Sequence, residues 1–250
     1  MTTNMNRPAF PYRESIGSLT YEAVCTRPDI AMAVNLCARF VEKPGPQHVR
    51  AVKNVLRYLK ATSSLGIQFN YCKTSDMQLK TYVDADYAGD KAERRSIPGF
   101  IGMLNGPIYW TSKRQACVTL SSTEAEYVAA TNACQEIAWC RRLLNELCFQ
   151  QEATVLLEDN QATIKLALSE TVTRRCKHID VRHHYIRELV RDGVVRLDYC
   201  PSDENLADIM TKPLGRGRFA KLHSPLVAAP PEHQVPASAL AIVHPALGGC

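Results

Sequence analysis

The dipeptide Asn105-Gly106 stands between two short apolar runs and constrains the fold more than any other feature of the chain. Asn and Gly both tolerate the positive φ angles that tight β-hairpin turns require. The apolar runs on either side cover residues 100–104 and 107–111. We therefore predict two antiparallel strands here, preceded by a strand at 79–84. Residues 116–120 also have strand character and could form one more.

The chain after this hairpin alternates between helix and strand patterns. Apolar residues recur at helical spacing over 122–148, and Ser121 with Glu124 fits a capping box at the start of that helix. Further on we expect a strand at 154–157, a helix at 161–169, a helix at 180–191, a strand at 194–199 and a helix at 206–211. A hairpin followed by β-α units predicts an α/β domain with a mixed sheet and helices on its faces.

The sequence divides into three parts, which is compatible with its 250 residues. Residues 1–75 are expected to be helical, with helices beginning near Pro28 and after the Pro44-Gly45-Pro46 break. Residues 76–214 form the predicted α/β domain. Residues 215–250 hold most of the prolines that follow Lys212, which are six of the 14 in the chain. Prolines at this density disfavour regular structure, so we expect the tail to be mostly unstructured.

Several classes of protein are disfavoured by composition. No stretch reaches the ~18–20 uncharged apolar residues of a membrane helix, and residues 1–13 lack the apolar core of a signal peptide. We therefore expect an intracellular protein with no membrane partner. The ten cysteines include no C-x-x-C pair, so they are interpreted as free thiols. The spacing of His178, His183 and His184 does not suit a zinc site on a helix.

The formal charge of +5 is unevenly distributed. Residues 1–76 hold 10 Lys/Arg against 5 Asp/Glu, residues 77–212 hold 17 against 19, and the tail holds 3 against 1. Four of the basic residues recur at spacings of three and four on one face of the helix after Pro46, namely Arg50, Lys53, Arg57 and Lys60. This face is either solvated or a stripe that contacts nucleic-acid phosphates.

Four acidic residues stand at the ends of predicted elements: Asp84, Glu126, Asp159 and Asp208. Strand ends and helix starts can bring side chains together on a rigid scaffold. Carboxylates gathered in this way need cations, and oxygen ligands suit Mg²⁺. Two such ions can activate a water and stabilise the leaving oxygen of a phosphodiester. Each acid could instead end a strand, cap a helix or form a turn, and spacing alone does not decide.

Five segments resemble, in order, the ribonuclease H domain of copia-type retrotransposon Pol polyproteins. They are residues 82–90, 121–130, 158–162, 177–187 and 205–214. Residues 11–21, 25–30 and 55–60 resemble the end of a copia-type reverse transcriptase. The resemblance implies a ribonuclease H-like fold, with a five-stranded mixed sheet flanked by helices, that cleaves the RNA strand of RNA–DNA hybrids.

The same resemblance implies roles for individual residues. Asp84, Glu126, Asp159 and Asp208 would be catalytic and would hold two Mg²⁺ ions, for which Mn²⁺ could substitute. Asp86 is the alternative to Asp84, because strand alternation places both on one side. Three further residues, Ser122, Thr123 and Gln161, would contact the minor groove of the hybrid, which displays the 2′-hydroxyls of RNA. The basic stripe Arg50, Lys53, Arg57 and Lys60 would bind its backbone. The resemblance also covers residues 177–187, so the helix there would be scaffold, with Arg182 facing the backbone of the hybrid.

Two departures from the family pattern matter. The loop at 200–205 lacks the histidine that cellular ribonucleases H carry before the last helix, so Asp203 or Glu204 is the candidate substitute. The Tyr-x-Asp-Asp motif of the polymerase is absent, so we expect no polymerase activity.

The expected partners are an RNA–DNA hybrid and the rest of a reverse transcriptase or Pol polyprotein, in the cytoplasm, a virus-like particle or the nucleus. The alternatives are a fragment that binds nucleic acid without cutting it and a nuclease of this fold that acts on DNA.

Overall fold

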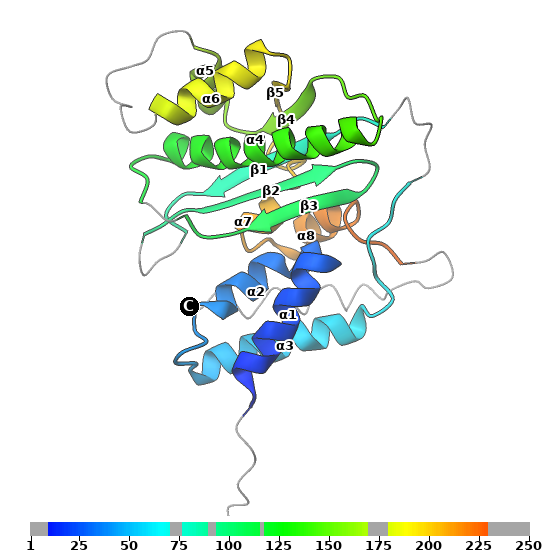
Figure 1. The fold of residues 1–250 in the computed structure, drawn as a ribbon. Coiled ribbons are helices and arrows are strands. Elements are labelled where there is room, and N and C mark those ends of the chain that lie inside the picture. The colour runs from blue at the N-terminus through cyan, green and yellow to red at the C-terminus, as the bar shows by residue number, and fades with distance from the viewer. Residues whose placement is uncertain (1–9, 71–76, 90–93, 116–117, 170–179, 230–250) are drawn as a thin grey trace, which may run out of the picture.

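The computed structural model describes residues 10–70, 77–89, 94–115, 118–169 and 180–229. Five strands form one central sheet, and helices lie on both of its faces (Figure 1). The expected α/β architecture, a five-stranded mixed sheet flanked by helices, is confirmed. Among the described residues, no helix is long and apolar enough to cross a membrane.

The strand order in the sheet is β3-β2-β1-β4-β5. The strands are β1 (Lys80–Asp86), β2 (Ile97–Met103), β3 (Pro107–Ser112), β4 (Thr154–Glu158) and β5 (Val195–Tyr199). β1, β2 and β3 pair in antiparallel fashion, whereas β4 pairs in parallel with both β1 and β5. Asn105 has a φ of 58° in the turn between β2 and β3, as the hairpin prediction requires. Residues 118–120 form no strand, and residues 116–117 lie outside the described chain.

Helix α4 (Ser122–Glu146) covers one face of the sheet, and α5 (Gln161–Leu168) and α6 (Asp180–Arg191) lie beside it (Figure 1). The predicted cap is present, because the Ser121 hydroxyl accepts a hydrogen bond from the backbone N–H of Glu124 at 3.1 Å. The buried face of α4 is rich in alanine, which lets the helix approach the strands closely. Ala129 and Ala133 pack in one cluster with Val83 of β1.

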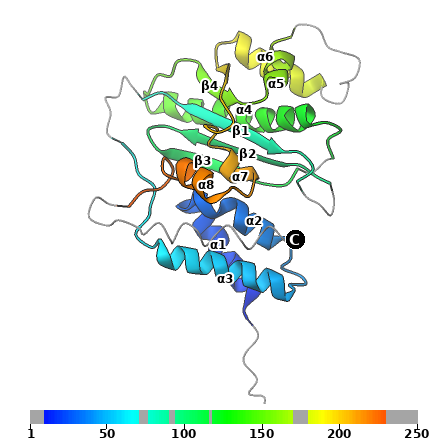
Figure 2. The ribbon, with the colours of Figure 1, turned by 180° about the vertical axis from the view of Figure 1, so that it is seen from behind.

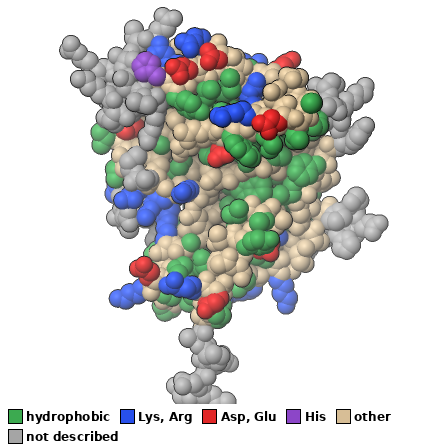
Figure 3. All heavy atoms as spheres, viewed as in Figure 1, with side chains coloured by type: hydrophobic (Ala, Val, Ile, Leu, Met, Phe, Trp, Pro, Cys, Tyr) green, Lys and Arg blue, Asp and Glu red, His purple; other side chains and the backbone are tan. Residues whose placement is uncertain are grey.

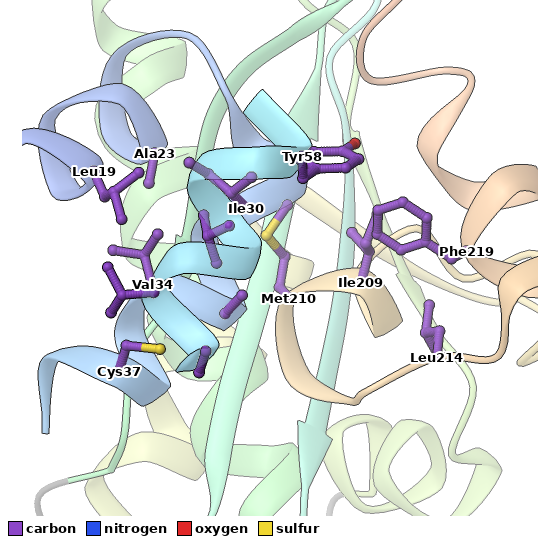
Figure 4. Packing of buried hydrophobic residues seen from close by; sticks show 14 of the residues in the cluster. Leu19, Ala23, Ile30, Val34, Cys37, Tyr58, Ile209, Met210, Leu214 and Phe219 are labelled. Atoms are coloured by element: carbon purple, nitrogen blue, oxygen red, sulfur yellow. The ribbon is translucent and has the colours of Figure 1, made fainter. Parts of the chain in front are cut away.

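The other face of the sheet is covered by two groups of helices (Figure 2). One group is C-terminal: α7 (Asp208–Thr211) and α8 (Arg216–His223). The other is N-terminal: α1 (Tyr12–Cys25), the short 3-10 helix η1 (Pro28–Ile30), α2 (Ala31–Ala38) and α3 (Pro46–Ala61). Figure 4 shows that Ile30 and Tyr58 from the N-terminal group meet Met210 and Phe219 from the C-terminal group in one hydrophobic cluster.

A buried polar network joins the same two groups of helices. The guanidinium of Arg27 forms an ion pair with Asp29 at 2.8 Å, and the Tyr58 hydroxyl donates to Asp29 Oδ2 at 2.6 Å. His223 Nε2 of α8 lies 3.1 Å from the Tyr58 hydroxyl. Burial alone would raise the pKa of Asp29, but hydrogen bonds with His223 and Arg27 hold it well below its usual range. The boundary proposed near residue 75 therefore separates two parts of the sequence that pack tightly together.

The expectation of an unstructured tail from residue 215 is wrong for its first part. Helix α8 begins at Arg216, and Phe219, Leu222 and Leu226 are buried. These three residues recur at spacings of three and four, so they present one apolar face to the core. The proline-rich residues 230–250 lie outside the described chain, as do His178 and the side chains of Arg182 and His183. The six cysteines within the described residues are all free, as expected.

Candidate active site

Asp84 lies near the carboxyl end of β1 and is completely buried. Its Oδ2 accepts a hydrogen bond from the Thr211 hydroxyl, and its Oδ1 lies 2.8 Å from the Lys212 ammonium. Burial raises the pKa of Asp84, and the positive charge of Lys212 opposes that rise. Asp86, the alternative in the sequence, is only half-buried and belongs to neither carboxylate group described below.

Asp208 is held close to Asp84 by the loop that precedes α7. The side-chain amide of Asn205 donates to the backbone carbonyl of Val83 at 2.8 Å, and its oxygen accepts from Ala207 N at 3.1 Å. This pair of bonds ties the start of α7 to β1. The carboxylate of Asp208 is completely buried and binds Lys212 at 2.8 Å and the Arg218 guanidinium.

Asp159 directly follows β4, the parallel neighbour of β1. Because parallel strands end at the same edge of a sheet, Asp159 comes next to the end of β1. The chain turns sharply there, since the Asn160 side chain caps α5 through the N–H groups of Ala162 and Thr163 at 3.0 and 3.2 Å.

Glu126 lies one turn into α4 and is 6% exposed. One of its carboxylate oxygens, Oε2, is buried without a hydrogen-bond partner among the described residues. Burial raises the pKa of Glu126 to about 11, and the negative charges of Glu158, Asp84 and Asp159 add to the rise. A buried carboxylate of this kind is costly to leave ionised, so it either binds a proton or needs a cation close by.

The four predicted acids come together at one edge of the sheet. Oxygens of Asp84, Asp159 and Asp208 lie within 4.8 Å of one another, and so do oxygens of Glu126, Glu158 and Asp159. Asp159 belongs to both groups and links them. The residues come from β1, α4, the end of β4 and α7, so only the folded chain assembles them.

The donor set suits hard divalent cations. Every member of both groups offers carboxylate oxygen, the ligand that Mg²⁺ and Mn²⁺ prefer. The unpartnered Oε2 atoms of Glu126 and Glu158 provide buried acceptors on one side. On the other side, the Lys212 ammonium already lies between Asp84 and Asp208, which marks that space as one that attracts positive charge.

The residues expected to contact nucleic acid lie in two places. Ser122 and Thr123 are at the start of α4, one turn from Glu126, and Gln161 opens α5 two residues after Asp159. These three are therefore close in sequence to Glu126 or Asp159. The basic residues Arg50, Lys53, Arg57 and Lys60 are all exposed on α3, and basic side chains are visible around the lower part of the face shown in Figure 3.

The loop that lacks a histidine presents acidic residues to solvent. Asp203 and Glu204 are both exposed, and Asp203 forms a 3.0 Å ion pair with Lys221 of α8. This ion pair lowers the pKa of Asp203. Neither residue belongs to the carboxylate groups found among the described residues.

Four residues of this site were absent from the sequence prediction: Glu158, Thr211, Lys212 and Arg218. Glu158 shares the buried side of β4 with Thr154 and Leu156, so strand alternation could have identified it. Lys212 is four residues after Asp208, a spacing at which helical side chains meet. Its contact with Asp84 depends on the packing of α7 against the sheet, which no local pattern reveals.

Comparison with known proteins finds relatives among the Pol polyproteins of plant transposons. No family model matches the chain. The retrovirus-related Pol polyprotein from transposon TNT 1-94 of Nicotiana tabacum is 45% identical over 215 residues, which are 86% of this chain and 16% of that protein. The Pol polyprotein from transposon RE1 of Arabidopsis thaliana is 40% identical over 85% of this chain and 14% of its own length. The chain thus spans about a sixth of these relatives.

A shorter relative is matched over most of its own length. The protein named secreted RxLR effector protein 161 of Plasmopara viticola is 45% identical over 130 residues, which are 52% of this chain and 90% of that protein. Among solved structures, LC11-RNase H1 in complex with RNA/DNA hybrid matches 54% of this chain and 94% of its own, with a TM-score of 0.42 and 11% identity. Over most of its length, the chain is homologous to copia-like retrovirus-related Pol polyproteins from plant transposons.

Proposed function

We propose that this chain is a nuclease that hydrolyses the RNA strand of RNA–DNA hybrids with the help of two divalent metal ions. The observation that carries the proposal is the meeting of Asp84, Glu126, Asp159 and Asp208 at one edge of a ribonuclease H-like sheet. The homology to Pol polyproteins of plant transposons supports a role in the reverse transcription of a retrotransposon.

The carboxylates would hold the metals, Asp84 and Asp208 on one side and Glu126 on the other, with Asp159 shared. Bound divalent ions supply an activated water and stabilisation of the leaving oxygen. Ser122, Thr123 and Gln161 are within four residues of Glu126 or Asp159, and their polar side chains would contact the 2′-hydroxyls that distinguish RNA from DNA. The residues of this chain thus position the RNA strand over the acids.

A cleavage assay tests this proposal. Labelled RNA–DNA hybrid, incubated with the purified protein and Mg²⁺, should be cut in its RNA strand, and chelation of Mg²⁺ should stop the reaction. Asp159→Asn should abolish cutting, because it removes a negative charge from both carboxylate groups. Asp192→Asn makes the same chemical change at an exposed residue beyond α6 and should leave cutting intact. Equal cutting of duplex DNA would contradict the assignment of the substrate.

One contact favours a second candidate, a fragment that binds nucleic acid without cutting it. The Lys212 ammonium lies 2.8 Å from both Asp84 and Asp208, in the space that a metal would use. If this lysine is not displaced, the site remains without its full complement of cations. In that case the wild-type protein and Asp159→Asn would both be inert, and both would retard the hybrid in a gel.

A further inference from the structure

Glu158 is a buried acid beside the four predicted carboxylates and is not one of them. It is the last residue of β4 and has no exposed surface. Thr154 and Leu156 share its side of the strand, and Leu156 packs in the cluster formed with α4. The Glu158 side chain therefore faces the layer of α4, from which Glu126 comes.

The two oxygens of Glu158 are in different situations. Oε1 accepts a hydrogen bond from the backbone N–H of Asn160 at 3.0 Å, which fixes the orientation of the carboxylate. Oε2 is buried and has no hydrogen-bond partner within the described chain, as is true of Oε2 of Glu126. A buried carboxylate oxygen left unsatisfied destabilises the fold, because the water that solvated it in the unfolded chain is not replaced. Both residues belong to the carboxylate group that includes Asp159, and unsatisfied oxygens on two of its members indicate that a cation or a shared proton is missing.

No basic side chain in the described part of the molecule supplies that partner. Among those residues, no lysine or arginine forms an ion pair with Glu126 or Glu158, whereas Lys212 and Arg218 both bind Asp208 on the other side of the site. An oxygen from each of Glu126, Glu158 and Asp159 lies within 4.8 Å of the others. Three carboxylates at this separation can surround one divalent ion, since a metal of this kind takes oxygens at about 2.0–2.6 Å.

We propose that Glu158 is a fifth carboxylate ligand of the site and shares, with Glu126 and Asp159, the divalent ion on the α4 side. This inference rests on the proposed metal-dependent function. It predicts that the ion on this side is held by three carboxylates that form no ion pair with a described lysine or arginine. Glu158 thus contributes to the affinity for metal, in addition to shaping the turn through Asn160.

Titration calorimetry with Mn²⁺, without nucleic acid, tests the proposal. Glu158→Gln keeps an oxygen that can accept from the Asn160 N–H but loses the charge, so the affinity for Mn²⁺ should fall about tenfold or more. In metal-free buffer, this variant should unfold at the same temperature as the wild type or higher, because a like-charge contact is relieved. Glu152→Gln, at an exposed position just before β4, is the matched control and should bind Mn²⁺ as the wild type does.

A second variant keeps the test decisive if Glu158→Gln does not fold. Glu158→Cys places a soft thiolate at the same position, and thiolates favour soft metals. If Glu158 is a ligand, this variant should gain affinity for Cd²⁺ relative to Mn²⁺. Wild-type Mn²⁺ affinity in Glu158→Gln, or an unchanged metal preference in Glu158→Cys, would overturn the proposal.

The outcomes also separate this inference from the proposed function. A wild-type protein that cuts hybrid while Glu158→Gln binds Mn²⁺ normally would refute only the role of Glu158. A wild-type protein that does not cut, combined with weakened binding of Mn²⁺ in Glu158→Gln, would refute the nuclease and leave the ligand assignment standing. A wild-type protein that binds no Mn²⁺ would refute both.

Discussion

Gly99 lies directly opposite Asp84 in the antiparallel pair of β1 and β2. A Cβ atom at Gly99 would be 2.6 Å from Cβ of Met210 and 2.7 Å from Cγ2 of Thr211. The missing side chain therefore lets α7 lie directly on the sheet. Because α7 carries Asp208, the close approach at Gly99 determines how near the carboxylates of Asp208 and Asp84 come.

Gly99→Ala should destabilise the protein and weaken its binding of metal. The added methyl group must push α7 away from β2, and overpacking of this kind costs typically about 1–3 kcal/mol. Denaturant unfolding should show this loss, and calorimetry should show a reduced affinity for Mg²⁺. Gly17→Ala is the control, because a Cβ atom at this position in α1 meets nothing within 4 Å. It should raise stability by up to about 1 kcal/mol. Equal losses in both variants would contradict this account.

Lys212→Met should make the metal-free protein less stable but more responsive to Mg²⁺. The ammonium partly neutralises Asp84 and Asp208, and losing hydrogen bonds to charged groups costs about 1.5–3 kcal/mol each. Without the lysine, Mg²⁺ has no competitor from this side chain between these carboxylates. The rise in melting temperature on adding Mg²⁺ should therefore exceed that of the wild type.

The exposed Lys113 offers the matched control for this measurement. Lys113→Met removes an equal charge outside the site and should leave both the metal-free melting temperature and its rise with Mg²⁺ unchanged. A smaller rise in Lys212→Met than in the wild type would mean that the lysine supports metal binding instead of competing with it.

Much of the fold is predictable because its signals are local. Helix α6 has the predicted limits, and β1 and β4 differ from prediction by only a few residues. The spacing of apolar residues and the turn residues that predict these elements lie within or next to the elements themselves. Helix α8 is hard to predict because the many prolines of the tail disfavour a helix, although Phe219 and Leu222 have helical spacing. The packing of α1–α3 against α7 and α8 joins residues far apart in sequence, and no local pattern encodes it.

The candidate site was predictable only in part for the same reason. Asp84, Glu126, Asp159 and Asp208 stand at the ends of elements, where a sequence can be searched for them. The ion pair of Lys212 with Asp84 spans 128 positions and arises from the close contact at Gly99. Glu158 does not stand out in the sequence because its neighbour Asp159 carries the family motif, although strand alternation places Glu158 on the buried side.

Acid should loosen the contact between the N-terminal helices and α8, and Asp29 should be the cause. Its pKa is lowered in the folded protein, so its ionised form stabilises the fold above its ordinary pKa of 3.8. That stability is lost as the pH falls below about 4. The free energy of unfolding should therefore decrease between about pH 4 and pH 2 in the wild type. Asp29→Asn should be less stable at neutral pH and should lack this part of the decrease. An identical acid profile in both proteins would exclude Asp29 as the group responsible.

The basic face of α3 should bind the phosphate backbone of the hybrid. Arg50 and Arg57 are exposed, and removing one arginine–phosphate interaction should lower the slope of log affinity against log salt by about 0.9. The double variant Arg50→Gln, Arg57→Gln should therefore bind more weakly, with a slope reduced by roughly 1.8, in fluorescence anisotropy at several salt concentrations. Arg191→Gln, Arg196→Gln removes the same charge from exposed positions elsewhere and should keep the wild-type slope. If both double variants behave alike, the basic face is simply solvated.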